Sequence, residues 1–379
     1  MRILKIVNGS DEGGVFNCEV QYINELTNKG IEVVLIIIGD GRNKENYCSL
    51  TKDNYCFSYF DGDLRGGVYN KAKKILWNWR ESKEISIEVS KVYQDITFDC
   101  IIFRRNYFML IAYSLGRKLN VKKKYWHMPS DIKNNNFKLI YTNLLKRFKI
   151  SPIANSEYTK KSIGSICKQV LYPGFNWQRT SVNFNATTFK DVYSIPSDHI
   201  VLGIASRICY IKAQDLVVQA LQNERFKNKK FVLLIAGIVQ DNYILEKIKE
   251  DAGVLFGSKF IYIGNVDNMS KFYASIDVLV NSGRDPEPFG ISIAEALGSS
   301  LPIIASDKGG PAETVIEGYN GWTFKGFELQ DYITVFDKFF ESIDKVKEYG
   351  KNSYIHSEKF TVENNVQKLI SIIDAKYSD

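Results

Sequence analysis

The sequence predicts an α/β protein built from two doubly wound domains, each with a parallel sheet. Two observations carry this prediction. Strand-like apolar runs alternate with helical periodicity along most of the chain, and strands that each lead into a helix form parallel sheets covered on both faces. The chain has 379 residues, of which 45% are hydrophobic, which is enough apolar material for two ordinary cores.

The first series of elements opens with a β-α-β unit. A strand at residues 3–7 is followed by a helix at about 14–29, which ends at Gly30, and by a strand at 32–38. Residues 173–197 are polar and rich in turn residues, which is typical of a linker. Further strands are predicted before this linker at 100–103, 125–128, 151–154 and 170–171.

A second alternating series follows the linker. Its strands are predicted at 200–205, 231–236, 260–263, 278–280 and 302–305, and its helices near 213–223, 243–251 and 290–298. We therefore place a first domain at residues 1–178 and a second domain at 179–361. Ligands of such sheets bind at the carboxyl ends of the strands, so two such domains are expected to face a central cleft that combines both sets of strand ends.

The composition excludes several classes of protein. Apolar runs such as residues 33–38 are far shorter than the roughly 20 residues of a membrane-spanning helix. The first apolar run turns polar at residues 8–10, too early for a signal peptide, so we expect a cytoplasmic protein. Six cysteines without a C-x-x-C pair and three histidines do not form a disulfide framework or a zinc site at the usual spacings.

Positive charge is concentrated in the first half of the chain. Residues 1–180 hold 29 Lys and Arg against 17 Asp and Glu, whereas residues 181–379 hold 21 against 26. Residues 101–150 hold 12 basic residues and one acidic residue, interleaved with aromatic residues. This stretch is either a solvated charged face or an attachment site for an anionic surface.

The apolar spacing of residues 139–149 is that of an amphipathic helix with a cationic flank, which suits a membrane interface. No RRM, KH, zinc-finger or helix-turn-helix signature is present in the sequence. We therefore expect an anionic membrane surface as a partner, with the protein peripheral on the inner face of the membrane, and we expect no nucleic acid.

The most informative stretch, residues 281–298, follows a predicted strand and opens a helix. Prolines and Gly290 stiffen a tight turn, and the first free N–H groups of the helix are expected to bind an anion there. Glu287 and Glu295 would be separated by roughly 12 Å along the axis if all steps were helical, which suits an elongated ligand with a phosphate in the middle. The alternative is a Glu287 that complements the helix dipole and a Glu295 on a solvated face.

Further turns point to the same phosphate. Arg207 and Lys212 lie between a strand and a helix, where they could hold a nucleoside diphosphate without a metal ion; the alternative is two exposed cations. The pair Gly309–Gly310 permits close approach of the backbone in another strand-to-helix turn, unless it is an ordinary turn before a helix that starts with proline. Residues 13–14, also both glycine, repeat this device in the first domain, where a plain turn is the alternative.

Together these motifs resemble those of the family 4 glycosyltransferases, which are retaining enzymes of the GT-B fold, with two Rossmann-like domains. The resemblance covers nearly the whole chain and is closest to enzymes of surface polysaccharide synthesis. In the second half it rests, in the family's order, on Arg207 and Lys212, on residues 234–237 and 277–280, on Glu287-Pro288-Phe289-Gly290 with Glu295, and on Gly309-Gly310 with Glu313. In the first half it rests on residues 13–14, 29–33, 126–127 and 154–157.

The resemblance implies a role for each matching residue of the second domain. Glu295 would hold the ribose hydroxyls of a nucleotide sugar, and Arg207 and Lys212 would hold its diphosphate. Glu287, together with the backbone of residues 288–290, would hold the transferred sugar. This group of donor-binding residues comprises Arg207, Lys212, Gly237, Pro288, Phe289, Gly290 and Glu295.

In the first domain, the resemblance implies that His127 lies beside the donor sugar and the incoming hydroxyl, unless it is a core or capping histidine. Gly14 would let the first helix approach the phosphates. The final helix, within residues 362–379, would pack back on the first domain. The family needs no metal, because cations and a helix dipole stabilise the leaving group. The chain has Ser206, Ala213 and Ser300 at positions where the family usually has glycine.

The expected reaction is transfer of a hexosyl unit from a nucleoside-diphosphate sugar to a hydroxyl of a saccharide or lipid-linked acceptor, with retention of configuration. Alternatives are a GT-B sugar-nucleotide epimerase or phosphorylase, and a catalytically silent surface-binding subunit of a transferase complex. Residues 61–63, Asp-Gly-Asp, mimic the D-x-D metal site of the other major glycosyltransferase fold, in a stretch expected to be a loop from 53 to 69. G-x-G-x-x-G, Walker A and G-x-S-x-G motifs are absent from the sequence.

Overall fold

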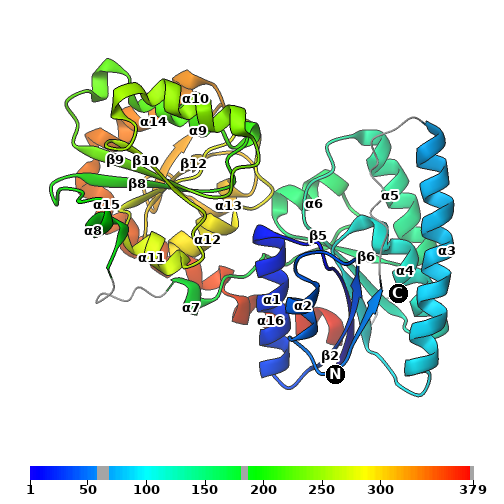
Figure 1. Ribbon diagram of the computed structural model, residues 1–379. Helices are drawn as coiled ribbons and strands as arrows, with labels where there is room; N and C mark the ends of the chain where they lie inside the picture. Colours follow the sequence, from blue (N-terminus) through cyan, green and yellow to red (C-terminus); the bar gives the residue numbers. More distant parts are fainter. Residues whose placement is uncertain (58–67, 181–186, 376–379) are drawn as a thin grey trace. The chain divides into compact units, whose positions relative to one another are not determined.

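The chain folds into two compact units (Figure 1). The computed structural model describes residues 1–57, 68–180 and 187–375. Unit 1 comprises Met1–Gly174 and Val362–Asp379, and unit 2 comprises Phe175–Thr361. The second unit begins four residues before the expected position 179, because Phe175 is anchored in it. The Phe175 N–H donates to the carbonyl of Phe360 at 3.0 Å, and its ring lies against Gly298.

Unit 1 is built on a seven-stranded parallel sheet of order β3-β2-β1-β4-β5-β6-β7. Since β2 lies on one side of β1 and β4 on the other, the chain winds outward in both directions, as predicted. The strands are β1 (Arg2–Asn8), β2 (Glu32–Ile38), β3 (Asn54–Phe57), β4 (Cys100–Phe103), β5 (Lys123–Met128), β6 (Ser151–Ala154) and β7 (Gln169–Val170). The main helices are α1 (Gly13–Asn28), α2 (Lys44–Cys48), α3 (Val68–Tyr93), α4 (Met109–Lys118), α5 (Asn135–Phe148), α6 (Glu157–Ile163) and α16 (Val362–Asp374).

Unit 2 has a six-stranded parallel sheet of order β10-β9-β8-β11-β12-β13. Its strands are β8 (Ile200–Ala205), β9 (Phe231–Ala236), β10 (Phe260–Gly264), β11 (Val278–Val280), β12 (Ile303–Ser306) and β13 (Gly321–Phe324). Its main helices are α9 (Gln214–Leu221), α10 (Asn242–Ala252), α11 (Met269–Ala274), α12 (Ile291–Gly298), α13 (Pro311–Thr314), α14 (Leu329–Glu341) and α15 (Val346–Ser357). The prediction of two doubly wound α/β domains is thus confirmed.

Two stretches that were expected to be irregular contain regular elements. Residues 54–57 form β3, a partly exposed edge strand that pairs with β2, and α3 begins at Val68, inside the stretch predicted as a loop. The predicted linker contains α7 (Trp177–Thr180) and α8 (Phe189–Val192). Such short elements lack the periodicity that predicts longer ones. Residues 61–63 lie outside the described residues.

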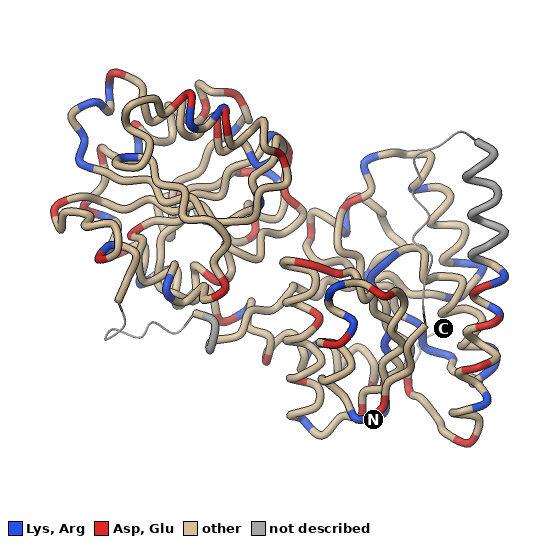
Figure 2. Tube along the Cα trace, viewed as in Figure 1, with Lys and Arg blue, Asp and Glu red and all other residues tan. Residues whose placement is uncertain are grey.

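Helix α5 exposes an apolar face. The side chains of Phe137, Leu139 and Ile140 are 55%, 64% and 51% exposed, whereas Leu145 and Phe148 are buried. The helix carries basic residues and no acidic residue. By contrast, both charge signs alternate along the described part of α3 (Figure 2). None of the helices in the described part of the chain is long and apolar enough to cross a membrane.

Helix α16 packs on unit 1, to which the chain returns after unit 2. The Tyr172 N–H donates to the side-chain oxygen of Asn365 at 3.1 Å, and the ammonium of Lys123 donates to the carbonyl of Ile373. Val366 and Leu369 of the helix are buried. The last helix of the chain is therefore part of the core of the first unit.

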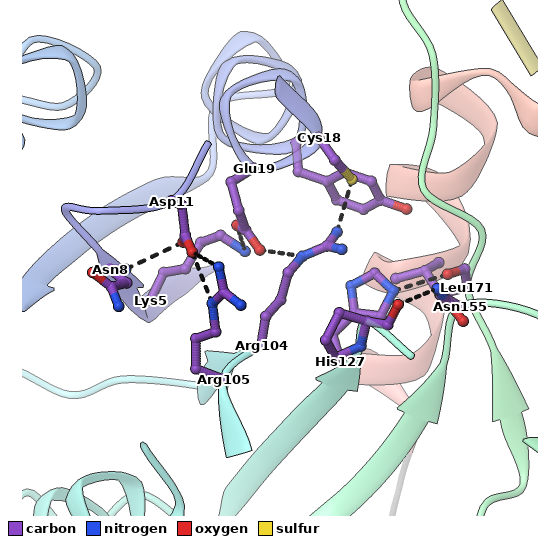
Figure 3. A network of polar contacts seen from close by, with 12 residues as sticks. Lys5, Asn8, Asp11, Cys18, Glu19, Arg104, Arg105, His127, Asn155 and Leu171 are labelled. Atoms are coloured by element: carbon purple, nitrogen blue, oxygen red, sulfur yellow. Dashed lines mark hydrogen bonds and ion pairs between the residues drawn. The ribbon is translucent and has the colours of Figure 1, made fainter. Parts of the chain in front are cut away.

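A buried ion triad fixes α1 on the sheet of unit 1 (Figure 3). Glu19 of α1 lies 2.6 Å from the ammonium of Lys5 on β1 and contacts the guanidinium of Arg104 after β4. Burial opposes ionisation of Glu19, but the two cations outweigh it and hold its pKa below the ordinary value. All three side chains are almost completely buried, so each charge depends on the others for compensation.

We predict that Glu19→Ala lowers the free energy of unfolding by about 3–5 kcal/mol, because it leaves two buried cations without a carboxylate. Urea unfolding followed by tryptophan fluorescence measures the change. Glu25→Ala is the matched control on the same helix, since Glu25 forms a partly exposed i,i+4 pair with Lys29, and its expected cost is about 0.5 kcal/mol. Equal costs for the two variants would contradict the structural role of the triad.

Candidate functional site

The candidate residues of unit 2 lie at the point where the winding of its sheet reverses. Strands β8 and β11 are neighbours, and the chain moves outward from them in opposite directions. The loops that follow these two strands therefore meet at the carboxyl edge of the sheet, where open α/β sheets bind ligands. The first loop carries Arg207 and Lys212, and the second carries Glu287.

The loop after β8 is held by side-chain hydrogen bonds. The amide of Gln214 donates to the Ser206 hydroxyl at 2.9 Å and to the carbonyl of Arg207 at 2.8 Å. The exposed guanidinium of Arg207 donates to the side-chain oxygen of Gln240 at 3.0 Å. Lys212 ends a short 3-10 turn and is only partly exposed. The alternative of two exposed cations is therefore wrong for Lys212, whereas Arg207 does project into solvent.

Lys212 and Glu287 form an ion pair across the two loops. Their side chains approach to 2.8 Å, and the amide of Asn281 donates to the other oxygen of the Glu287 carboxylate at 2.9 Å. Burial raises the pKa of Glu287. The charge of Lys212, the hydrogen bonds from Lys212 and Asn281, and the charge of Arg207 together outweigh burial and lower that pKa below its ordinary value. The carboxylate is therefore ionised and accepts hydrogen bonds only.

Residues outside the predicted set bind the two loops together. The Ser282 hydroxyl donates to the carbonyl of Lys212 at 2.5 Å, and the Arg284 N–H donates to the carbonyl of Ile211 at 3.0 Å. The Arg284 guanidinium lies 2.6 Å from the buried carboxylate of Asp215. Ser282, Arg284 and Asp215 lie beside the motif residues in the sequence, but their pairing across the loops could not be recognised from spacing.

The pair Gly309–Gly310 packs against the turn that carries Glu287. The Gly310 N–H donates to the carbonyl of Glu287 at 2.8 Å, and a Cβ at Gly310 would lie 2.3 Å from the Cα of Phe289. Glycine is thus required for close approach of two backbones, in addition to starting α13 at Pro311. The turn does precede a helix that starts with proline, and its glycines serve the packing of two backbones. Contact of this turn with a phosphate stays a prediction.

Helix α12 opens directly after Gly290, whose φ of +93° favours glycine. The side chain of Phe289 is buried, whereas Glu287 and Pro288 before it are partly exposed. Glu295 is 4% exposed and accepts a hydrogen bond of 2.7 Å from the hydroxyl of Tyr273. The alternative of a Glu287 in the first helical turn and a Glu295 on a solvated face is therefore wrong.

Gly237 has a packing role at the end of β9. Its φ is +143°, and a Cβ there would lie 2.0 Å from the carbonyl oxygen of Ser206. The absence of a side chain lets the end of β9 pack against the loop after β8. Contact of Gly237 with a donor stays a prediction.

Two of the three positions that depart from the family's glycines have a left-handed backbone. Ala213 has φ of +53° and Ser300 has φ of +60°. A non-glycine residue costs about 1–2 kcal/mol in this conformation, which explains why glycine suits these positions. These two departures therefore concern backbone strain, whereas the hydroxyl of Ser206 accepts a hydrogen bond from Gln214.

The predicted residues of the first domain lie at the carboxyl edge of the unit 1 sheet (Figure 3). His127, on β5, is 2% exposed, and its Nε2 lies 2.8 Å from the carbonyl of Leu171. Burial first, and then the nearby charge of Arg104, lowers its pKa well below the ordinary value. The ring is therefore neutral, with the Nε2 hydrogen on the carbonyl and Nδ1 as an acceptor. Gly14 is exposed in the first turn of α1, and both donor-site roles stay predictions.

A second polar cluster occupies the corresponding winding reversal of unit 1, between β1 and β4. Arg105 donates from Nε to the buried carboxylate of Asp11 at 2.8 Å. Burial raises the pKa of Asp11, and Arg105 opposes that effect. Among the described residues, no group of three or more His, Cys, Asp or Glu side chains is arranged to hold a metal ion.

Parts of the sequence are similar to a known protein family and to known glycosyltransferases. Residues 185–356 match the family described as Glycosyl transferases group 1. The chain is 23% identical over 180 residues to D-inositol 3-phosphate glycosyltransferase 2 of Catenulispora acidiphila, covering 45% of this chain and 42% of that protein. It is 27% identical over 132 residues to the lipopolysaccharide core biosynthesis mannosyltransferase LpcC of Rhizobium leguminosarum bv. viciae, covering 34% and 36%. The matched stretch spans less than half of these relatives' own length.

Solved structures show the same fold over almost the whole chain. A glycosyltransferase of Rickettsia africae ESF-5 matches with a TM-score of 0.80 and 20% identity, over 98% of this chain and 97% of that chain. Anabaena Alr3699/HepE, in complex with UDP and glucose, matches with a TM-score of 0.78 and 19% identity, over 98% and 99%. The chain therefore has the GT-B fold, and most of its second unit matches the group 1 family.

We predict that Gly310→Ala lowers the free energy of unfolding of unit 2 by about 3 kcal/mol, because the new methyl group overlaps the backbone of the Glu287 turn. Gly318→Ala is the matched control, since Gly318 has φ of +72° and a Cβ there would make only an ordinary contact of 3.9 Å with the Tyr349 hydroxyl. Strain alone costs about 1 kcal/mol there. Denaturant titration of both variants measures the difference. A Gly310→Ala variant as stable as the wild type would contradict the close approach of the two turns.

Proposed function

We propose that this protein is a retaining, metal-independent glycosyltransferase that uses a nucleoside-diphosphate sugar. The observation that carries the proposal is the ion pair of Lys212 and Glu287 at the winding reversal of the unit 2 sheet. It combines an ionised carboxylate, which suits sugar hydroxyls, with a cation and an open helix N-terminus, which suit a diphosphate.

The charge of the leaving group decides the chemistry of this site. A departing nucleoside diphosphate gains negative charge in the transition state, and fixed cations and helix N–H groups stabilise such charge. Arg207, Lys212 and the first turn of α12 would supply this stabilisation. Glu287, held ionised by Lys212 and Asn281, would accept hydrogen bonds from the transferred sugar.

The reaction proceeds by exchange at the anomeric carbon of the donor sugar. The bond from this carbon to the phosphate oxygen breaks, and the leaving group departs as the nucleoside diphosphate. The acceptor oxygen bonds to the same face of the sugar, and its proton passes to the departing phosphate oxygen. No protein side chain acts as a nucleophile, so the roles of Glu287 and Lys212 are binding and electrostatic stabilisation.

The comparisons support the donor class. The Anabaena protein was solved in complexes with UDP, with UDP and glucose, and with UDP-glucose. The curated relatives named above are glycosyltransferases with inositol phosphate and lipopolysaccharide core in their names. We propose for this chain a saccharide or lipid-linked acceptor in surface polysaccharide synthesis, bound by the first unit with His127 beside the incoming hydroxyl.

We predict that Lys212→Ala and Glu287→Ala each lower donor turnover by at least about 10²-fold, because each removes transition-state stabilisation of several kcal/mol. Release of nucleoside diphosphate from a panel of nucleotide sugars, with and without acceptors, measures turnover. Lys190→Ala is the matched control. Lys190 also forms an ion pair, at 2.7 Å with Asp277, but Asp277 lies at the amino end of β11 and the site lies at the carboxyl end. Unchanged rates in both site variants would refute the proposal, and release of an altered nucleotide sugar would favour an epimerase.

We also propose that the first unit attaches to an anionic membrane surface through α5. The exposed Phe137, Leu139 and Ile140 lie on a helix whose charged residues are all basic. Apolar side chains enter the headgroup region while cations attract anionic lipids, and the two effects reinforce each other. This placement would bring a lipid-linked acceptor to the first unit.

We predict that Leu139→Ser combined with Ile140→Ser weakens binding to vesicles containing anionic lipid by about tenfold or more, because apolar area no longer enters the interface. Co-sedimentation at low salt measures binding. The control is Ile87→Ser combined with Val92→Ser, since these residues of α3 are also exposed but lie among charges of both signs. Equal binding by the wild type and both double variants would refute attachment through α5.

A further inference from the structure

A buried tyrosine lies against the second glutamate of the site. Tyr273 of α11 donates its hydroxyl to the Oε2 atom of Glu295 on α12 at 2.7 Å. The tyrosine is 1% exposed and the glutamate 4%. Helices α11 and α12 precede and follow strand β11 in the chain (Figure 1). The hydrogen bond joins them through the fifth residue of α12.

The hydroxyl of Tyr273 is not explained by packing. Its neighbour Phe272 fills an equally buried position with a ring that has no polar group. A buried phenol needs a hydrogen-bond partner, so a tyrosine is favoured over phenylalanine only where its hydroxyl is used. Here it is used on a carboxylate, and hydrogen bonds to charged groups are stronger than those between neutral groups.

The hydrogen bond constrains how Glu295 can bind a ligand. A rigid donor on one oxygen of a carboxylate restricts the directions in which the other oxygen can point. A ring buried in a helix has few rotamers, so its hydroxyl is held in place before any ligand arrives. A preorganised acceptor is what a vicinal pair of hydroxyl groups requires for selective binding.

Resting on the proposed function, we propose that Tyr273 is a positioning residue that orients the Glu295 carboxylate toward the ribose hydroxyls of a nucleoside diphosphate. Tyr273 itself does not touch the nucleotide. It makes the site selective for ribonucleotides over deoxyribonucleotides, because a correctly aimed carboxylate loses its partner when the 2′-hydroxyl is absent. Without the tyrosine hydroxyl, the carboxylate binds both kinds of sugar with similar, weaker affinity.

The test compares Tyr273→Phe with the wild type in binding two ligands. Isothermal titration calorimetry first identifies whether UDP or GDP binds, and then measures that nucleotide and its 2′-deoxy analogue. We expect the wild type to prefer the ribonucleotide by about tenfold, in the range of one hydrogen bond to a charged group. We expect Tyr273→Phe to weaken ribonucleotide binding by about the same factor and to change binding of the deoxy analogue little.

The ratio of the two affinities separates a positioning role from a structural one. A merely structural tyrosine would weaken both ligands equally and leave the ratio as in the wild type, which would overturn the inference. Tyr349→Phe is the matched control, since Tyr349 is also buried in unit 2 but packs on Trp322 away from the site. It is expected to keep the wild-type ratio.

Two further outcomes are decided by the same measurements. A wild type that binds neither UDP nor GDP would refute the proposed function, and the inference with it, whereas a wild type that binds one of them with no preference for ribose refutes the inference alone. If Tyr273→Phe does not fold, as judged by circular dichroism, Glu295→Gln replaces it. This variant keeps an oxygen for Tyr273 but loses the charge, and a wild-type ratio there also overturns the inference.

Discussion

The site of unit 2 depends on the reversal of winding between two neighbouring parallel strands. Because β8 and β11 lie side by side and their connections leave in opposite directions, no helix covers the edge directly between them. The two loops that follow must share this edge, and each supplies one charge of the Lys212–Glu287 pair. The rest of the site is arranged to keep these two loops at a fixed distance.

Compensation of charge is the second constraint. Three strongly buried carboxylates have cations beside them: Glu19 has Lys5 and Arg104, Asp11 has Arg105, and Asp215 has Arg284 and Lys247. An uncompensated charge in such places costs several kcal/mol. The same ion pairs that satisfy this demand also fix α1 on its sheet and fasten the loop after β8 to the loop after β11, so they shape the carboxyl edges at which ligands bind.

Most strands and some of the long helices could be predicted, since their periodicity is local. The predicted strand at 32–38 and helix at 14–29 differ from the observed elements by at most one residue, as do the strands at 200–205 and 231–236. The edge strands β3 and β13 and the helices α3, α4, α14 and α15 were not predicted. Strand β3 has only four residues and is not strongly apolar. In the site, Lys212, Glu287 and Glu295 could be identified as candidates by their residue types and their order in the motifs. Whether these side chains are solvated or buried was decided only by the structure.

The sequence by itself determined the fold class, the position of the candidate loops after β8 and β11, and the types of charge that they carry, because hydrophobic period and turn chemistry act over a few residues. Only the tertiary structure decided which groups meet. Lys212 and Glu287 are 75 positions apart, and Tyr273 and Glu295 are 22 positions apart. Such pairings follow from strand order and helix packing, and these are set by burial across the whole sheet, to which local spacing is blind.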